Sequence, residues 1–234
     1  MVMDTMVFAH RGIPVKEPEN SLSGFQYCLD HGAAGLEFDI HLTKDSIPVI
    51  MHDEKIDRTT DGSGLINSYS YDQLSQFRLS NGEKIPTLDE FIDLVAGKDV
   101  WLNLEFKTNK IHYLGIEKIV LQKMNAANLK HHVIYSSFNI DSLRVARMLD
   151  ETQDYNFLFE KQLADPAKTM KKEHLNGLHP GYYIPGFEDH ERIWTVDDQK
   201  EQAKLFQAGV AGIFTNDFIS AEKLKQQLLQ ESIK

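Results

Sequence analysis

The segment GLEFDIHL, residues 35–42, alternates strictly between apolar and ionisable side chains after its first residue. Successive side chains of a β-strand point to opposite faces, so Glu37, Asp39 and His41 share one face and the apolar residues between them share the other. The apolar face is suited to packing against helices. The opposite face gathers two carboxylates and an imidazole.

A second segment, LNLEFK at residues 102–107, repeats this arrangement. Its apolar residues fall on one face of the predicted strand, and Asn103, Glu105 and Lys107 fall on the other. An antiparallel sheet with one solvated face is the alternative reading of such alternation. The surrounding sequence decides between the two readings.

Short apolar runs alternate with segments of helical periodicity along most of the chain, which is typical of parallel strands covered by helices. We expect strands near residues 7–10, 35–42, 100–107, 132–137, 155–160, 176–179, 192–196 and 212–215. We expect helices near residues 21–31, 87–95, 111–127, 141–149, 166–174, 198–208 and 220–230. Eight such units predict an α/β fold of the closed (β/α)₈, or TIM-barrel, type.

A doubly wound open sheet is disfavoured because no Gly-x-Gly-x-x-Gly turn follows the first predicted strand. The segment 43–86 is too long for a simple connection, so we expect a small insertion there, after the second strand and over the active face. No interdomain linker is evident, and residues 1–234 are predicted to form a single barrel domain.

The composition excludes several classes of function and of site. The 234 residues include 25 Lys and Arg against 35 Asp and Glu, which gives a net charge of −10 and argues against a nucleic-acid partner. The single cysteine, Cys28, excludes an internal disulfide or a Cys-rich zinc site. No signal peptide and no run of about 20 apolar residues is present, so we expect a cytoplasmic protein without a transmembrane segment.

Carboxylates that point into a parallel barrel are costly unless they are paired or hold a cation. Glu37, Asp39 and Glu105 would supply only oxygen ligands, which Mg²⁺ and Ca²⁺ both prefer. The sequence therefore predicts one divalent cation, either Mg²⁺ or Ca²⁺. His41 lies on the same predicted face and is a weaker candidate ligand.

Two histidines are candidates for proton transfer. His10 ends the first predicted strand, where the carboxyl ends of barrel strands face the active site, and His52 follows an apolar run shortly after the Glu37 strand. Imidazole can give or take a proton near neutral pH, so the two can form an acid/base pair. Arg11 offers a bidentate donor to phosphate oxygens. His179, at the end of another predicted strand, is a further but weaker candidate.

Taken in order, these residues resemble the glycerophosphodiester phosphodiesterase family, of the bacterial, cytoplasmic type. The matching blocks are HRG (10–12), EPENS (17–21), EFDIHLTKD (37–45), PVIMHD (48–53), DRTTDGSG (57–64), IPTL (85–88), NLEFK (103–107), WTV (194–196) and GIFT (212–215). A single His-Arg-Gly motif is weak evidence for a family, but this ordered series of motifs covers nearly the whole chain and is highly specific.

The resemblance implies a (β/α)₈ barrel with a small inserted segment, a divalent cation held by Glu37, Asp39 and Glu105, and catalytic His10 and His52. It implies that substrate contacts come from Arg11, Lys107 and Trp194. Glu19, in the Pro-Glu-Asn motif, would orient the metal ligands without binding the metal itself. Departures from the family pattern include His41, Asp197 in place of the Asn that usually follows Trp-Thr-Val, and the altered ending Thr215–Phe218.

The expected reaction is metal-dependent hydrolysis of a glycerophosphodiester to sn-glycerol 3-phosphate and an alcohol, with the two histidines as general acid and general base. Either water or a neighbouring glycerol hydroxyl can serve as nucleophile, and either histidine as base. Three alternatives stay open: a lysophospholipase D acting on acylated substrates, a barrel that binds phosphodiesters without cleaving them, and a metal-dependent sugar isomerase. The expected partner is a small-molecule glycerophosphodiester substrate, and the oligomeric state is left open.

Overall fold

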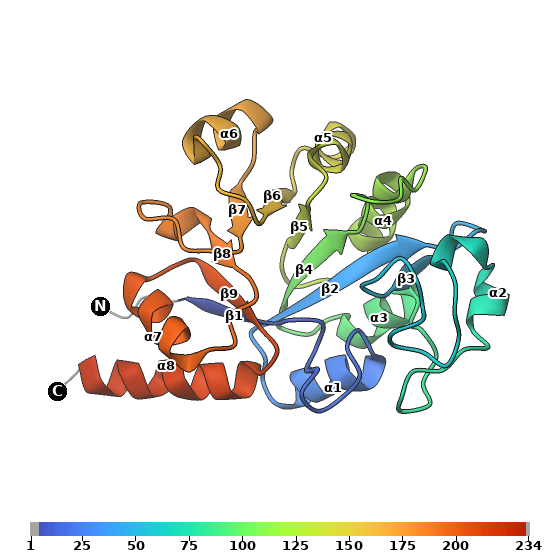
Figure 1. The fold of residues 1–234 in the computed structure, drawn as a ribbon, viewed down its shortest axis with the longest axis horizontal. Coiled ribbons are helices and arrows are strands. Elements are labelled where there is room, and N and C mark those ends of the chain that lie inside the picture. The colour runs from blue at the N-terminus through green and yellow to red at the C-terminus, as the bar shows by residue number, and fades with distance from the viewer. Residues whose placement is uncertain (1–4, 233–234) are drawn as a thin grey trace.

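Eight parallel strands form a nearly closed barrel in the computed structural model, which describes residues 5–232 (Figure 1). The strands are β1 (Met6–Ala9), β2 (Gly35–Leu42), β4 (Trp101–Phe106), β5 (Val133–Ser137), β6 (Asp154–Phe159), β7 (Gly177–Pro180), β8 (Arg192–Ile193) and β9 (Gly212–Thr215). All eight fall where the sequence predicts them, so the expected (β/α)₈ architecture is confirmed.

The hydrogen-bonded order runs β7-β6-β5-β4-β2-β1-β9-β8. At the two ends of this order, a parallel bridge links Leu178 of β7 to Glu191, the residue before β8, and nearly closes the ring. The backbone after β8 continues between its neighbours, because Trp194 N donates to Pro180 O and Val196 N donates to Phe214 O. The regular strand is therefore shorter than the predicted 192–196, but the backbone of these residues runs between β7 and β9 as predicted.

Helices lie outside the strands and begin at local capping signals. They are α1 (Leu22–Asp30), α3 (Leu88–Val95), α4 (Ile116–Ala126), α5 (Ile140–Leu149), α6 (Pro166–Glu173), α7 (Gln199–Ala208) and α8 (Phe218–Ser232). Ser21 caps α1, and Thr87 with Glu90 forms a capping box on α3. Helix α4 begins at residue 116 rather than 111, because Gly115 takes a left-handed conformation with φ 79°.

The apolar faces of β2 and β4 pack outward against these helices. Phe38 of β2 contacts Phe91 of α3 and Phe25 of α1, with ring centroids 4.2 and 6.3 Å away. Phe38 and both partners are fully buried. This packing fixes which face of β2 points inward, because a shift by one residue would bury the ionisable side chains among the helices.

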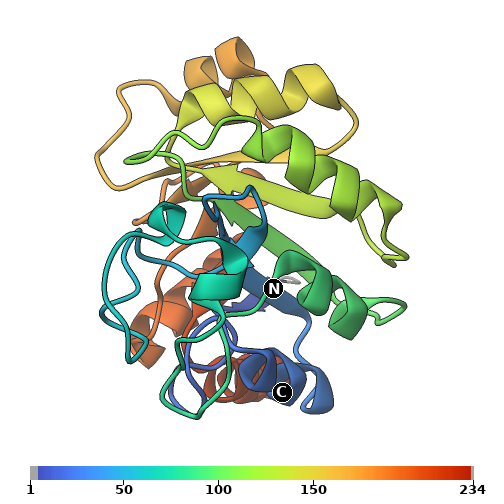
Figure 2. The ribbon, with the colours of Figure 1, turned by 90° about the vertical axis from the view of Figure 1, so that its right-hand side faces the viewer.

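Residues 43–86 form an extra layer beside β2, seen in teal in Figure 2. The segment contains β3 (Pro48–Ile50), the 3₁₀ helix η1 (Ile66–Ser68) and the short helix α2 (Tyr71–Leu74). Strand β3 pairs antiparallel with β2 and is not among the strands predicted from the sequence. Apolar residues give the segment a small core of its own: Val49, Met51, Ile56, Ile66, Leu74, Leu79 and Ile85.

Among residues 5–232, no helix combines the length and apolar character needed to span a lipid bilayer.

Candidate active site

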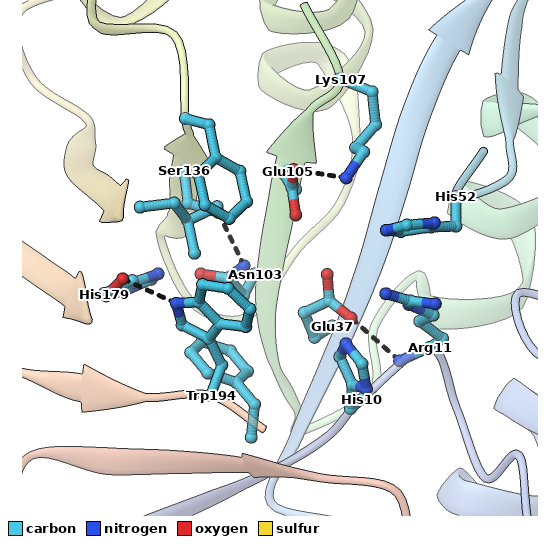
Figure 3. Close-up of a pocket in the computed structure, with 13 residues that line it drawn as sticks. His10, Arg11, Glu37, His52, Asn103, Glu105, Lys107, Ser136, His179 and Trp194 are labelled. Carbon is cyan, nitrogen blue, oxygen red and sulfur yellow. Dashed lines mark hydrogen bonds and ion pairs between the residues drawn. The ribbon is translucent and has the colours of Figure 1, made fainter. Parts of the chain in front are cut away.

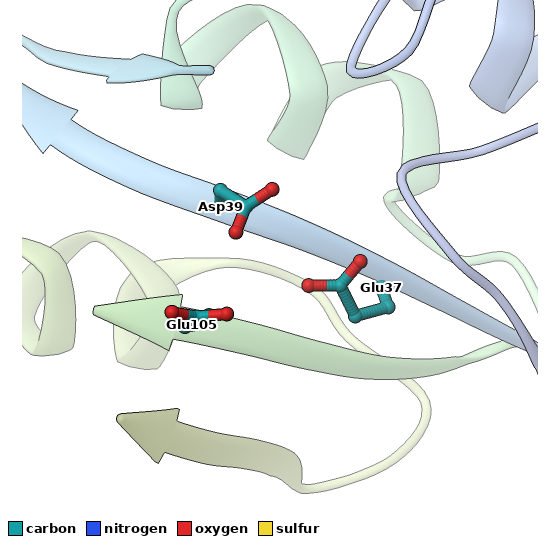
Figure 4. Close-up of side chains that lie close together, drawn as sticks. All are labelled: Glu37, Asp39 and Glu105. Carbon is teal, nitrogen blue, oxygen red and sulfur yellow. The ribbon is translucent and has the colours of Figure 1, made fainter. Parts of the chain in front are cut away.

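Three carboxylates meet inside the barrel on neighbouring strands (Figure 4). Glu37 and Asp39 come from β2 and Glu105 from β4, and the strand register places Asp39 beside Glu105. One oxygen of each carboxylate lies within 4.8 Å of one oxygen of the other two. The three residues are only 4, 1 and 7 % exposed. The structure therefore brings together the three predicted metal ligands.

The cluster is fixed by two groups from the loop after β1. The backbone N–H of Arg11 donates to Glu37 Oε2 at 2.9 Å, and Asn20 Nδ2 donates to Asp39 Oδ2 at 2.9 Å. Arg11 and Asn20 both take left-handed backbone conformations, with φ 54° and 55°. Such conformations are uncommon for residues other than glycine, and here they aim both groups at the carboxylates.

Two cations face the three carboxylates. Lys107 Nζ lies 2.8 Å from Glu105 Oε1 and 3.6 Å from Asp39 Oδ1, and Arg11 Nε lies 3.5 Å from Asp39 Oδ2. Burial and the nearby Asp39 raise the pKa of Glu37 well above its usual range. Burial also raises the pKa of Glu105 to about 7, against the opposing effect of Lys107.

Asp39 differs from its two neighbours. Burial by itself would raise its pKa, but Lys107 and Arg11 hold the pKa below its usual range. The cluster thus combines one firmly ionised carboxylate with two that favour a proton when no cation is bound. A divalent ion would favour the ionised form of all three carboxylates, and the all-oxygen donor set fits Mg²⁺ or Ca²⁺.

His10 and His52 line the same pocket and have different partners (Figure 3). His10 Nδ1 lies 2.8 Å from Asn216 Oδ1. Asn216 Nδ2 in turn donates to Asp197 Oδ2 at 2.6 Å, which leaves the amide oxygen of Asn216 facing His10. Because an amide oxygen accepts only, Nδ1 of His10 carries the hydrogen and Nε2 is the free acceptor.

His52 is backed by a carboxylate instead of an amide. His52 Nδ1 lies 2.7 Å from Asp53 Oδ1, and Asp53 accepts two hydrogen bonds from Arg58. Burial, followed by Arg11, lowers the pKa of His10 to about 4. Burial also lowers the pKa of His52, although Asp39 and Asp53 oppose this. The two imidazoles therefore differ in the charge of the group behind Nδ1, which is an amide for His10 and a carboxylate for His52.

Glu19 lies behind the phosphate-binding candidates. Its carboxylate forms a bidentate pair with Arg58 at 2.7 Å and also bonds Arg11 Nη1 at 3.2 Å. Glu19 therefore links the loop that carries Arg11 to the inserted segment that carries Arg58.

His41 does not belong to the acidic cluster formed by the described residues. Its Nδ1 lies 2.8 Å from the Tyr113 hydroxyl and its Nε2 lies 2.7 Å from the backbone oxygen of His52. Both nitrogens are thus occupied, and the weak ligand candidate turns out to anchor the backbone of His52.

The pocket has an empty volume of about 370 Å³ and two unlike walls. Figure 3 shows the charged wall with His10, Arg11, Glu37, His52 and Lys107 on one side, and Trp194 and His179 on the other. Trp194 packs edge-on against Phe138, and its Nε1 donates to the backbone oxygen of His179 at 2.8 Å. One wall can bind an anion and the other an uncharged, partly apolar group.

Several residues of the site were not assigned a role from the sequence. Asn20, Asp53 and Arg58 stand within the quoted motifs, but their partners come from other loops. Asp197 and Asn216 were visible as departures from the family pattern, 19 residues apart. Only the fold shows that Asp197 contacts Asn216 and that Asn216 contacts His10.

The chain matches the model of the glycerophosphoryl diester phosphodiesterase family over residues 10–187. A glycerophosphodiester phosphodiesterase of Caldanaerobacter subterraneus subsp. tengcongensis is 33 % identical, with 92 % of this chain and 95 % of that protein covered. One of Bacillus altitudinis is 30 % identical, with 96 % and 99 % covered.

Solved structures agree with these relatives. An Oleispira antarctica phosphodiesterase, in complex with the product sn-glycerol-3-phosphate, is 25 % identical with a TM-score of 0.85, covering 94 % of this chain and 96 % of that one. A glycerophosphodiester phosphodiesterase of Parabacteroides distasonis is 27 % identical with a TM-score of 0.82, and 99 % of each chain is covered.

Proposed function

The chain belongs to the glycerophosphoryl diester phosphodiesterase family, and from this premise we propose that it hydrolyses glycerophosphodiesters to sn-glycerol 3-phosphate and an alcohol, with one divalent cation. The observation that carries the proposal is the meeting of three buried carboxylates with two histidines, an arginine and a lysine in one pocket. The product named for the Oleispira antarctica structure supports the choice of substrate class.

Glu37, Asp39 and Glu105 would hold the cation, which is Mg²⁺ or Ca²⁺. When bound, the ion would act as a Lewis acid that offsets charge developing on the phosphoryl oxygens. Asp39 Oδ1 supports this assignment, because among the described residues it accepts no hydrogen bond although it is buried. Arg11 and Lys107 would bind the remaining phosphate oxygens from the same wall.

His10 is proposed as the general base. Asn216 accepts from Nδ1–H and thereby leaves Nε2 with a free lone pair. Its buried surroundings beside Arg11 disfavour the protonated ring before the reaction. His10 would take the proton of the attacking hydroxyl as the new P–O bond forms.

His52 is proposed as the general acid. Asp53 stands behind it and favours the protonated ring, so Nε2–H can be given to the leaving alkoxide as the old P–O bond breaks. Trp194 would pack against the glycerol or alcohol group, and Glu19 would position Arg11. Attack by water gives sn-glycerol 3-phosphate in this one step. Attack by a neighbouring glycerol hydroxyl gives a cyclic phosphate instead, which water would then open with the two histidines in exchanged roles.

An assay over a panel of deacylated phospholipid head-group diesters tests this function. We expect release of sn-glycerol 3-phosphate with added Mg²⁺ or Ca²⁺ and its loss on addition of EDTA. If no diester is cleaved with either ion, the proposed function is wrong.

The histidine pair is tested by His52→Ala. We expect turnover to fall about 10²- to 10⁴-fold, because the leaving alkoxide loses its proton donor. His132→Ala, at an exposed position, serves as the matched control and should keep normal turnover. Near-normal rates for His52→Ala, measured on correctly folded protein, would remove His52 from the pair.

We also propose that the chain forms a single domain over 1–234 with an inserted segment at 43–86, although residues 1–4 and 233–234 lie outside the described part. The hydrogen bond from His41 to the backbone of His52 supports a shared structure for barrel and insertion. A cytoplasmic location is proposed from the sequence and is tested by cell fractionation.

A further inference from the structure

His179, at the end of β7, is a buried side chain that the proposed chemistry does not use. The residue is 0 % exposed, and it lines the catalytic pocket on the wall opposite the histidine pair (Figure 3). Neither Nδ1 nor Nε2 has a hydrogen-bond partner among the described residues. The ring packs against Phe214, with centroids 5.1 Å apart.

A buried imidazole without partners is costly, because a neutral ring offers one donor and one acceptor that have given up water. Burial and the nearby Arg192 lower the pKa of His179 well below its ordinary value, so the ring is uncharged at neutral pH. The ring nitrogen that carries the hydrogen can donate to a hydroxyl oxygen, and the other nitrogen can accept from a hydroxyl hydrogen, so either nitrogen can bond a hydroxyl group. A neutral ring carries no charge to pair with the phosphate that the opposite wall would bind.

Asn103, on the same wall, also has a buried atom without a hydrogen-bond partner among the described residues. Its Nδ2 donates to Ser136 Oγ at 3.0 Å, while its Oδ1 is buried and accepts no hydrogen bond from the described residues. Asn103 pairs with Glu37 in the register of β4 and β2, so it lies directly beside the acidic cluster. Apolar side chains of Phe138, Leu158 and Phe214 surround these polar groups.

Resting on the proposed function, we propose that His179, together with Asn103, binds the terminal hydroxyl of the substrate's glycerol group. With the phosphate on the wall of Arg11 and Lys107, the glycerol carbons extend across the pocket, and the hydroxyl farthest from phosphorus reaches the opposite wall. The polar residues of that wall are closed to solvent, since Asn103 and His179 are 1 and 0 % exposed.

This arrangement selects among substrates. A fatty acyl chain on the terminal oxygen would remove the hydroxyl hydrogen and would need space where His179 and Phe214 are packed. The enzyme should therefore prefer deacylated glycerophosphodiesters over lysophospholipids.

A pair of substrates tests the contact without any variant. The first is glycerophosphocholine, and the second is the phosphocholine ester of propane-1,2-diol, which lacks only the terminal hydroxyl. We expect wild-type kcat/KM to be about 10- to 100-fold higher for glycerophosphocholine, mostly through KM. Equal kcat/KM values would overturn the inference while leaving the proposed function intact.

Variants of His179 test whether this residue causes the preference for glycerophosphocholine. His179→Leu should lose activity on glycerophosphocholine and keep its activity on the propanediol ester, so that the preference falls below about threefold. His179→Gln, which keeps a donor and an acceptor, should retain part of the preference. An equal loss on both substrates would contradict the proposal.

If His179→Leu fails to fold, as thermal unfolding would show, His179→Gln and the wild-type comparison still decide the question. Lysophosphatidylcholine supplies the last arm, and we expect at least a tenfold lower kcat/KM than for glycerophosphocholine. Comparable rates would show that this wall opens to admit an acyl chain. Cleavage of no diester at all would refute the proposed function instead.

Discussion

At the scale of single residues, the two histidines of the pocket differ in what stands behind them. Asn216 presents an amide oxygen to His10, and Asp53 presents a carboxylate to His52. Burial and Arg11 lower the pKa of His10 although the bond to Asn216 opposes them, whereas Asp39 and Asp53 favour the protonated ring of His52. The proposed division into base and acid rests on this difference.

Asp197 should act on catalysis through Asn216. In Asp197→Ala the Asn216 amide loses the partner that fixes its orientation, so His10 loses a defined acceptor. We expect kcat to fall about 10- to 100-fold with KM changed by less than about threefold. The exchange Asp197→Asn with Asn216→Asp keeps a continuous hydrogen-bond chain and should restore most of kcat. An unchanged kcat in Asp197→Ala would show that this contact does not position His10.

Glu191 should destabilise the protein at alkaline pH. It is buried, its Oε2 accepts from Ile184 N at 3.0 Å, and burial together with Glu188 raises its pKa to about 7. A carboxyl whose folded pKa is raised contributes its stability fully below about pH 4.5, and this contribution is lost as pH rises through about 7.

Glu191→Gln removes that charge and can keep the acceptor. Urea unfolding should therefore show the variant about 1–3 kcal/mol more stable than wild type at pH 8, with no gain at pH 4. A gain of the same size at both pH values would point to packing instead of ionisation.

Among the secondary-structure elements, β2 and β4 carry the three carboxylates, and capped helices pack against these strands from outside. Thr87 Oγ1 accepts from the backbone of Glu90, and the Glu90 carboxylate accepts from the backbone of Thr87. The pair starts α3, whose Phe91 packs on β2 behind the acidic cluster.

Thr87→Ala removes half of this capping box. We expect a loss of about 1 kcal/mol in the free energy of unfolding with little change in kcat, because the inward face of β2 is unaffected. Denaturant unfolding and the diester assay, run on the same preparation, check both parts. A large loss of kcat would show that α3 also sets the position of the cluster.

At the scale of the whole molecule, the barrel draws its buried charges from strands and loops far apart in sequence. A cation that binds only the folded state should stabilise the molecule by about 2.7 kcal/mol at 100 times its dissociation constant. We expect added Mg²⁺ or Ca²⁺ to raise the unfolding temperature, and EDTA to reverse the change.

Glu105→Gln should abolish most of this thermal shift. Glu117→Gln is the matched control, because Glu117 is also buried but bonds Ser142 outside the cluster. An equal shift in wild type and Glu105→Gln would place the ion elsewhere.

The eight barrel strands and the face on which the carboxylates lie follow from the residue pattern alone. Side-chain alternation at residues 35–42 and 102–107 is a local property of extended backbone, and the alternation of strands and helices limits the architecture. The sequence missed strand β3 at 48–50 because its pairing partner, β2, is what makes that short run a strand.

The contacts of each functional side chain, in contrast, are visible only in the folded molecule. The Asp197–Asn216–His10 chain, the engagement of both nitrogens of His41, and the unpartnered ring of His179 depend on residues brought together from distant strands and loops. Hydrogen-bond partners and burial are set by three-dimensional packing, which a spacing along the chain does not specify.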